Sequence, residues 1–219
     1  CTIEPNIGIV EVPDARMQAL ADIVKPQRMQ YATTEFVDIA GLVAGASKGE
    51  GLGNQFLATI RETDGIVNVV RCFEDDNVVH VAGKVDPISD IATIVTELAL
   101  ADLTTVEKAQ ERNVKLVRSG DKDAAKLGEL LVQVAACLNE GKPARTLKLD
   151  PAQRALLKPL CLLTMKPVMY VANVAEKGFA NNPLLTRVEE YAAHEGAPVV
   201  AICAALESEI AVLDRKSVV

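Results

Sequence analysis

Short apolar segments bounded by turn residues alternate with longer segments of helical periodicity along much of the chain. The short segments are rich in Val and Ile and too short for independent helices, which favours β-strands. Between them, apolar residues recur at the spacing of amphipathic helices. The predicted strands are Ile7–Val12, Glu35–Ile39, Ile66–Phe73, Val168–Ala172 and Val199–Cys203, and the predicted helices are Asp14–Val24, Gly53–Thr63, Leu184–His194 and Glu207–Leu213.

The alternation stops in the middle of the chain, where residues 88–163 contain no convincing strand. A long helix is predicted to begin with Asp90 as its N-cap, and its apolar positions continue through Val106, Val114 and Val117. The sequence Ser119-Gly120-Asp121 then predicts a stop and a new start. The second helix ends near Gly141 and packs on the first, so that Leu127, Leu131, Val134 and Leu138 meet Ile94, Leu98 and Val106.

A third helix is predicted from Pro151 toward Leu163, with Asp150 as its cap. Together these features predict an α/β fold with a mostly parallel sheet, covered by helices on both faces, and an inserted antiparallel helical hairpin that resembles a coiled coil. Antiparallel pairing of the first two strands remains open, because the single helix between them need not form a crossover. The expected division is an α/β part at 1–87, the helical insert at 88–165 and a second α/β part at 166–219.

The composition is that of an ordinary globular protein, with 49% hydrophobic and 24% charged residues, which excludes disordered and collagen-like classes. No apolar run reaches the length of a membrane span and no signal-like leader opens the chain, so we expect neither a membrane nor an exported protein. The five cysteines are scattered without metal-ligand spacing, which is typical of reduced cytosolic thiols.

Charge is divided unevenly along the chain. Residues 93–166 contain 12 Lys and Arg against 9 Asp and Glu, a net charge of +3, whereas the rest contains 11 against 21, a net charge of −10. The helical insert is therefore the basic part of an acidic protein. A solvated helix surface explains this pattern, and a contact with an anionic partner such as RNA is the alternative.

The most informative segment is the end of the predicted strand Glu35–Ile39 with Gly41 after it, because an Asp-x-x-Gly motif begins there at Asp38. In P-loop NTPases the acidic residue at this place holds Mg²⁺ through water, and the glycine amide meets the γ-phosphate. The thirteen residues 41–53 contain five glycines, the first being Gly41 of the motif and the others at positions 45, 49, 51 and 53. A segment so rich in glycine cannot form a stable helix or strand interior, so it either wraps a ligand or changes conformation.

The segment DIAGLVAGASKGEGLGNQFL, with CTIEPN before it and RCFEDD after it, resembles the YchF/Obg-like ATPase family of translation-factor-related P-loop NTPases. The likeness continues through DPISDI, TELALADL, LLTMKPVMYVANVAE and AICAALESEI, and so covers nearly the whole chain. It implies an α/β nucleotide domain with an inserted helical hairpin, weak ATPase activity, and association with ribosomes in the cytoplasm.

The resemblance also implies roles for single residues. Thr2 matches the switch threonine that ligates Mg²⁺ when ATP is bound, and Asp38 and Gly41 match the metal-linked acid and the γ-phosphate-sensing glycine. The other matches concern the nucleotide base. They are Asn173, Val174 and Glu176, at the base-recognition tetrad where GTPases have Asn-Lys-x-Asp, and Cys203 and Ala204, in the loop that supports the base from its other side.

The base tetrad predicts a preference for ATP over GTP. In GTPases the tetrad's aspartate accepts hydrogen bonds from N1–H and the 2-amino group of guanine, and adenine offers neither donor. Here Glu176 is one methylene longer than aspartate, and Val174 replaces the lysine that packs over the base. A GTPase of the Obg-related class remains an alternative.

Two further features bear on catalysis. The residue after the Asp-x-x-Gly motif is Leu42, which cannot orient an attacking water, so His80 is the candidate for that role. No segment of this chain has the Walker A pattern GxxxxGK[ST], so we expect the chain alone to bind ATP poorly. A non-catalytic module, in which the basic hairpin docks a ribosome or protein partner, is therefore the third hypothesis.

Overall fold

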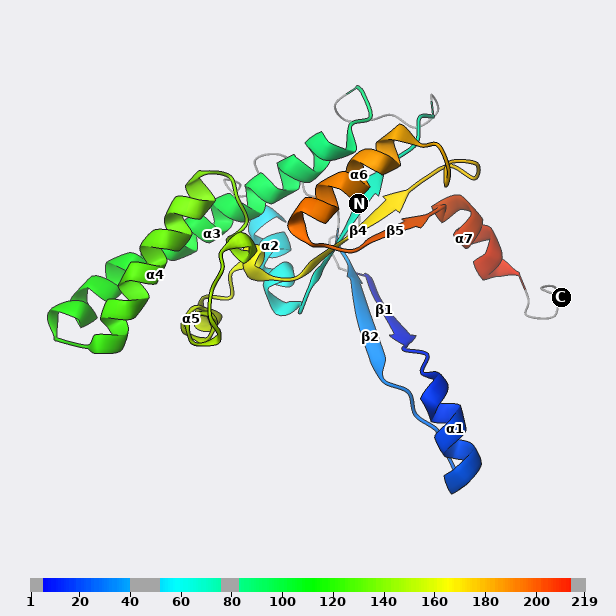
Figure 1. The fold of residues 1–219 in the computed structure, drawn as a ribbon, viewed down its shortest axis with the longest axis horizontal. Coiled ribbons are helices and arrows are strands. Elements are labelled where there is room, and N and C mark those ends of the chain that lie inside the picture. The colour runs from blue at the N-terminus through cyan, green and yellow to red at the C-terminus, as the bar shows by residue number, and fades with distance from the viewer. Residues whose placement is uncertain (1–5, 40–51, 76–82, 214–219) are drawn as a thin grey trace. The chain divides into compact units, whose positions relative to one another are not determined.

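The computed structural model describes residues 6–39, 52–75 and 83–213, with the backbone alone for residues 52–55 (Figure 1). The chain divides into two compact units, Cys1–Leu42 and Val43–Val219. None of the helices in the described ranges has both the length and the apolar character that crossing a membrane requires.

The first unit is a two-stranded ribbon with one helix at its turn. Strand β1 (Asn6–Glu11) pairs antiparallel with β2 (Thr33–Asp38), with Asn6 opposite Asp38. Helix α1 (Ala15–Val24) follows Asp14, whose carboxylate accepts from the Arg16 amide at 2.9 Å and so caps the helix. Antiparallel pairing, which the sequence left open, is therefore the one that forms.

The second unit contains a parallel sheet in the order β3–β4–β5, formed by β3 (Ile66–Arg71), β4 (Val168–Asn173) and β5 (Val199–Ile202). Helix α6 (Pro183–Glu195) connects β4 to β5, and the whole helical insert lies between β3 and β4. Because the strands are parallel, their carboxyl ends meet at one edge, where Arg71 pairs with Asn173 and Asn173 with Ile202.

One face of this sheet packs against α3 (Pro87–Arg118) and α6, as Figure 1 shows. Side chains on the other face remain exposed among the described residues, since Val69 is 62% and Val200 44% accessible. The predicted cover on both faces is thus found on one face of the described sheet, because both helices lie on the same side. The core on that face contains Val70, Tyr170 and Ala172 from the strands, Ile91 and Val95 from α3, and Val188 and Ala192 from α6.

Helix α3 begins four residues earlier than expected. Its N-cap is Asp86, whose carboxylate accepts from the amide of Ile88 at 3.3 Å, and Pro87 occupies the first turn. The prediction that Asp90 is the cap was wrong. Asp90 lies within the first turn, where the positive end of the helix dipole stabilises a carboxylate. Proline is well suited to a first helical position, because its missing N–H has no partner there in any case.

The predicted helical hairpin is confirmed. Helix α3 turns at Gly120, which has φ 85°, into α4 (Lys122–Asn139), capped by Asp121. The two helices lie side by side at the left of Figure 1. Their shared core includes Ala99 and Val106 from α3 and Leu130, Leu131, Val134 and Leu138 from α4.

The hairpin differs from the prediction toward its turn. Val114 and Val117 are 48% and 41% exposed, whereas Asn113 is buried and its amide donates to the Ala124 carbonyl at 2.7 Å. The buried stripe of α3 advances in steps of seven residues, from Ala99 through Val106 to Asn113, and this spacing leaves the valines on the outer face.

The insert returns to the sheet through short helices. Helix α5 (Pro151–Leu157) starts as predicted, with a capping box between Asp150 and Gln153, but it ends six residues before Leu163. Pro159, which lacks an N–H, lies in the 3₁₀ turn η2 (Lys158–Leu160) that follows, and a second turn, η3 (Leu163–Met165), comes before β4.

The buried carboxylate of Asp102 anchors this return to α3. It accepts from the amides of Leu163 and Thr164 at 2.8 and 2.7 Å and from the Thr164 hydroxyl at 2.6 Å. Burial raises the pKa of Asp102, and the hydrogen bonds from Thr164 and Leu163 oppose that shift. The sheet and the hairpin are therefore joined by a polar contact between residues about sixty positions apart in sequence.

Two helices complete the second unit. Helix α2 (Leu52–Glu62) lies close to its predicted range. The carbonyls of Arg61, in its last turn, and of Thr63, directly after it, accept from the ammonium of Lys166. Helix α7 (Ala204–Val212) begins three residues before the predicted Glu207.

Candidate functional site

The structure describes six of the nine candidate site residues. Thr2, Gly41 and His80 lie outside the described residues, so their predicted roles stay predictions. Asp38 belongs to the first unit and is exposed at the end of β2. The remaining candidates belong to the second unit, namely Asn173, Val174, Glu176, Cys203 and Ala204.

The two predicted base-recognition segments lie side by side at the carboxyl edge of the sheet. Asn173 ends β4, and its side-chain Oδ1 accepts from the amide of Ala204 at 3.0 Å. That amide is the first of α7, whose N-cap Cys203 provides no side-chain hydrogen bond. The asparagine therefore takes the place of a cap and joins the two segments.

The residues after Asn173 divide between core and surface. Val174 is buried, and its amide donates to the Ile202 carbonyl at 2.8 Å, so this N–H is already used. Glu176 is exposed. Hence the Val174 backbone can offer a ligand its carbonyl, and Glu176 carries the exposed acidic side chain of the tetrad.

The loop that follows is held by residues that the sequence reasoning missed. A Cβ on Gly178 would lie 3.1 Å from the backbone N and O of Ala175, so only glycine fits without a shift. The side-chain amide of Asn182 donates to the carbonyls of Gly178 and Cys72, at 3.0 and 2.9 Å. Its oxygen also caps α6, a role that the Asn-Pro pair at the start of that helix could have indicated.

The end of β3 forms the adjacent part of this edge. The guanidinium of Arg71 lies 4.7 Å from the centre of the Phe73 ring, and its Nε donates to the Phe73 carbonyl at 3.0 Å. The amide of Cys72 donates to the Asn173 carbonyl at 2.7 Å. Burial raises the pKa of the Cys72 thiol to about 11, which favours the protonated form at neutral pH.

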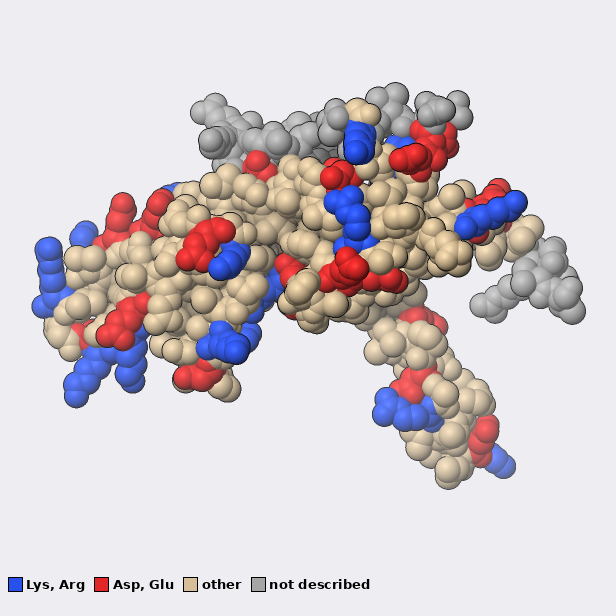
Figure 2. Space-filling model, turned by 45° about the horizontal axis from the view of Figure 1, so that its top comes forward, with Lys and Arg blue, Asp and Glu red and all other residues tan. Residues whose placement is uncertain are grey.

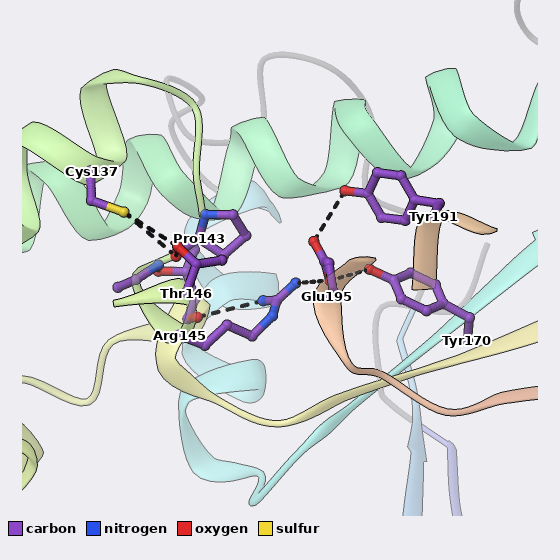
Figure 3. A network of polar contacts seen from close by, with 9 residues as sticks. Cys137, Pro143, Arg145, Thr146, Tyr170, Tyr191 and Glu195 are labelled. Carbon is purple, nitrogen blue, oxygen red and sulfur yellow. Dashed lines mark hydrogen bonds and ion pairs between the residues drawn. The ribbon is translucent and has the colours of Figure 1, made fainter. Parts of the chain in front are cut away.

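A largely buried polar network contacts β4 at Tyr170, within the strand that ends at Asn173 (Figure 3). Glu195, at the end of α6, accepts from Arg145 at 2.8 Å, from the Tyr170 hydroxyl at 2.9 Å and from the Tyr191 hydroxyl at 3.2 Å. Burial and the nearby Glu195 carboxylate raise the pKa of Tyr170. Arg145 lies in η1 (Ala144–Thr146), so the network joins the insert to the strand that ends in Asn173.

A magnesium site can be tested against the donors that are described. No group of three His, Cys, Asp or Glu side chains able to hold a metal ion occurs among the described residues. Asp38 offers an exposed carboxylate at a strand end, which suits an ion that keeps several waters and takes one or two protein ligands. The residue type therefore fits Mg²⁺ held together with a nucleotide.

Comparison with known proteins places the chain in a family. Residues 1–108 match the model of the 50S ribosome-binding GTPase family. The chain is 58% identical over 98% of its length to the ribosome-binding ATPase YchF of Haemophilus influenzae, and 52% identical, also over 98%, to that of Bacillus subtilis. It spans 59% of the length of each of these relatives.

A solved structure agrees with these relatives. The structure of the Schizosaccharomyces pombe YchF GTPase superposes with a TM-score of 0.82 at 33% identity, over 99% of this chain and 60% of that one. The matched fold is the P-loop GTPase-like α/β fold with a helical insert. On these grounds, the chain belongs to the YchF family.

Proposed function

We propose that this chain provides the nucleotide-reading part of an ATP-hydrolysing switch protein that acts on the ribosome in the cytoplasm. The observation that carries the proposal is the hydrogen bond from the Ala204 amide to Asn173 Oδ1, which brings the two base-recognition segments to one edge of the sheet. In parallel α/β sheets, ligands bind at the carboxyl ends of the strands. The names of the bacterial relatives, ribosome-binding ATPases, support the activity and the partner.

The preferred base is adenine. Position 174 holds a valine whose side chain is buried, and not the lysine that packs over the base in GTPases. The first polar side chain after Asn173 is that of Glu176. A carboxylate can only accept hydrogen bonds, and adenine N1 is an acceptor as well. The adenine 6-amino group is a donor, for which the Val174 carbonyl is a suitable acceptor. Both oxygens of Asn173 already accept hydrogen bonds, so its side-chain NH2 is the group left to donate to a ring nitrogen of the base.

Phosphate and Mg²⁺ would be bound by the first unit. Because Asn6 pairs with Asp38, the chain enters β1 and leaves β2 at the same end of the ribbon. Thr2 lies four residues before that end and Gly41 three residues after it. We therefore assign Thr2 and Asp38 to the ion and Gly41 to the γ-phosphate. When bound, Mg²⁺ neutralises charge on the β- and γ-phosphates.

Replacing Asn173 tests base recognition. In the complete protein, Asn173→Ala should weaken ATP binding by about tenfold or more, because it removes a base contact and frees the Ala204 amide. Asn139→Ala removes an exposed amide from the end of α4 and is the matched control. Competition against a fluorescent ATP analogue gives both affinities, and an unchanged affinity for Asn173→Ala would remove this residue from the site.

His80 is proposed to orient the attacking water, since Leu42 cannot. In the complete ATPase, His80→Ala should lower kcat by about a hundredfold and leave ATP affinity nearly unchanged. His194→Ala, at the end of α6, is the control and should leave kcat unchanged. Steady-state phosphate release measures both, and an equal kcat for wild type and His80→Ala would exclude the role.

The hairpin is proposed as the surface that contacts ribosomal RNA. Lys and Arg side chains gather at the free end of the hairpin in Figure 2, around the turn between α3 and α4. An exposed cluster of cations suits a phosphate backbone. The exposed basic residues near this turn are Arg112, Lys115, Arg118, Lys122 and Lys126.

A GTPase is the second candidate, and the specific observation in its favour is that the similar yeast protein is described as a GTPase. We also propose that the chain divides functionally into an α/β part at 1–87, the helical insert at 88–165 and a second α/β part at 166–219.

A further inference from the structure

A cleft of about 380 Å³ lies on the insert, between α5 and the segment that leads through η3 to β4. Leu157 and Leu162 contribute buried apolar surface to its lining, and Met165 is partly buried beside them. The volume falls in the range of about 300–1,000 Å³ that is usual for binding pockets. The cleft is thus large enough to take an apolar group of a ligand.

Cations surround this apolar lining. Arg154, Lys158 and Lys166 all border the cleft, and its lining contains no carboxylate. Lys166 is held in place by the carbonyls at the end of α2, whereas Lys158 is exposed. Among the described residues, the side-chain ammonium of Lys158 has no hydrogen-bond or ion-pair partner. The cleft therefore combines an apolar lining with uncompensated positive charge.

A second hollow has the same character. Its volume is about 280 Å³. It borders the same turn, η2, since Pro159 and Leu160 line it and the adjacent Lys158 lines the first cleft. Lys108 and Arg112 of α3 provide its charge, and again no carboxylate is present in its lining. Both hollows thus border η2 and combine cations with apolar side chains, and the residues that line them are called the η2 surface.

We propose that this surface docks an acidic segment of a partner protein through large apolar side chains. The three cations of the first cleft complement Asp and Glu, and the apolar lining needs a hydrocarbon group that a phosphate backbone does not have. No aromatic side chain lines either hollow, so stacking of nucleic-acid bases is not provided for. The proposed site is distinct from the nucleotide edge at Asn173 and does not depend on ATP binding.

The test is a selection from a random peptide library displayed on phage, with the complete protein immobilised. We expect enrichment of peptides that combine Asp or Glu with Leu, Ile, Met or Phe. A fluorescein-labelled copy of the most enriched peptide should bind wild-type protein in an anisotropy titration. Peptides without an excess of acidic residues would overturn the proposal.

Variants then locate the site. Arg154→Glu with Lys158→Glu reverses two charges at the cleft, and Arg118→Glu with Lys122→Glu makes the same net change at the hairpin turn. We expect the first pair to weaken peptide binding about tenfold and the second to change it less than about twofold. Equal losses in both pairs would show that overall charge, and not the cleft, attracts the peptide.

A neutral substitution separates shape from charge. Ala155 is an exposed residue that lines the cleft, and Ala155→Tyr fills part of it without altering a charge. We expect a loss of peptide binding of about tenfold, with unchanged ATP affinity and an unchanged circular dichroism spectrum. Full peptide binding by Ala155→Tyr would contradict the proposal. So would loss of labelled oligouridylate binding, with peptide binding intact, in the Arg154/Lys158 variant.

Discussion

The 219-residue chain is expected to bind ATP at least about a hundredfold more weakly than the same chain extended at its amino terminus by a strand, a Walker A loop and a helix. The Walker A backbone and its lysine neutralise most of the triphosphate charge in P-loop NTPases, and no segment of this sequence has that pattern. Each charge-assisted hydrogen bond of such a loop contributes about 1.5–3 kcal/mol, so losing several costs more than two orders of magnitude.

The described strands show where added structure could pair. In the second unit β3 pairs with β4 alone, and in the first unit β2 pairs with β1 alone. A strand added beside β3 would extend the parallel sheet without disturbing the edge at Asn173. Titration calorimetry on both forms measures the difference, with circular dichroism to show that each is folded. Micromolar ATP binding by the unextended chain would contradict the prediction.

Arg145→Met should destabilise the protein by about 3 kcal/mol. Arg145 and Glu195 form an ion pair at 2.8 Å with side chains only 15% and 11% exposed. Removing the arginine takes away the cation that Glu195 pairs with, and the hydrogen bonds left to the carboxylate among the described residues come from the hydroxyls of Tyr170 and Tyr191. The matched control is Arg187→Met, which breaks an exposed pair with Asp86 and should change stability little.

A double variant separates the cost of the unpaired charge from that of lost packing. Arg145 Nε has no hydrogen-bond partner among the described residues, so the guanidinium itself is only partly compensated. Arg145→Met combined with Glu195→Gln removes both charges and keeps an acceptor for the tyrosines, so it should recover most of the lost stability. Urea denaturation gives the free energy of unfolding of the wild type, Arg145→Met, Arg187→Met and the double variant. A double variant as unstable as the single one would mean that packing, and not charge, dominates here.

The sequence predicted the fold well where local signals agreed with periodicity. The Asp150-Pro151 cap, the Ser119-Gly120-Asp121 turn and the leucines of α4 were all found where expected. The start of α3 was wrong because Asp90 was preferred, although the pair Asp86-Pro87 is the stronger helix start. The cap was therefore present in the sequence and misread.

Other features could not be predicted from local pattern. Asn113 is buried where Val114 and Val117 were expected, because its side-chain amide donates to the Ala124 carbonyl, eleven residues away. The partners of Asp102 lie about sixty residues further along, so nothing near it indicates a buried acid. At the site, the tetrad at Asn173 was found by resemblance. Of its supports, Gly178 is revealed only by distances in the folded chain. The Asn182-Pro183 pair indicates a helix cap, but not the hydrogen bonds from Asn182 to Gly178 and Cys72.

The competition of ATP and GTP for the complete protein tests most directly whether the loops at Asn173 and Ala204 select adenine. We predict that ATP displaces a fluorescent ATP analogue at a concentration about tenfold or more below that needed for GTP, and that Asn173→Ala removes most of this difference. Equal displacement by GTP and ATP in the wild-type protein would contradict the claim.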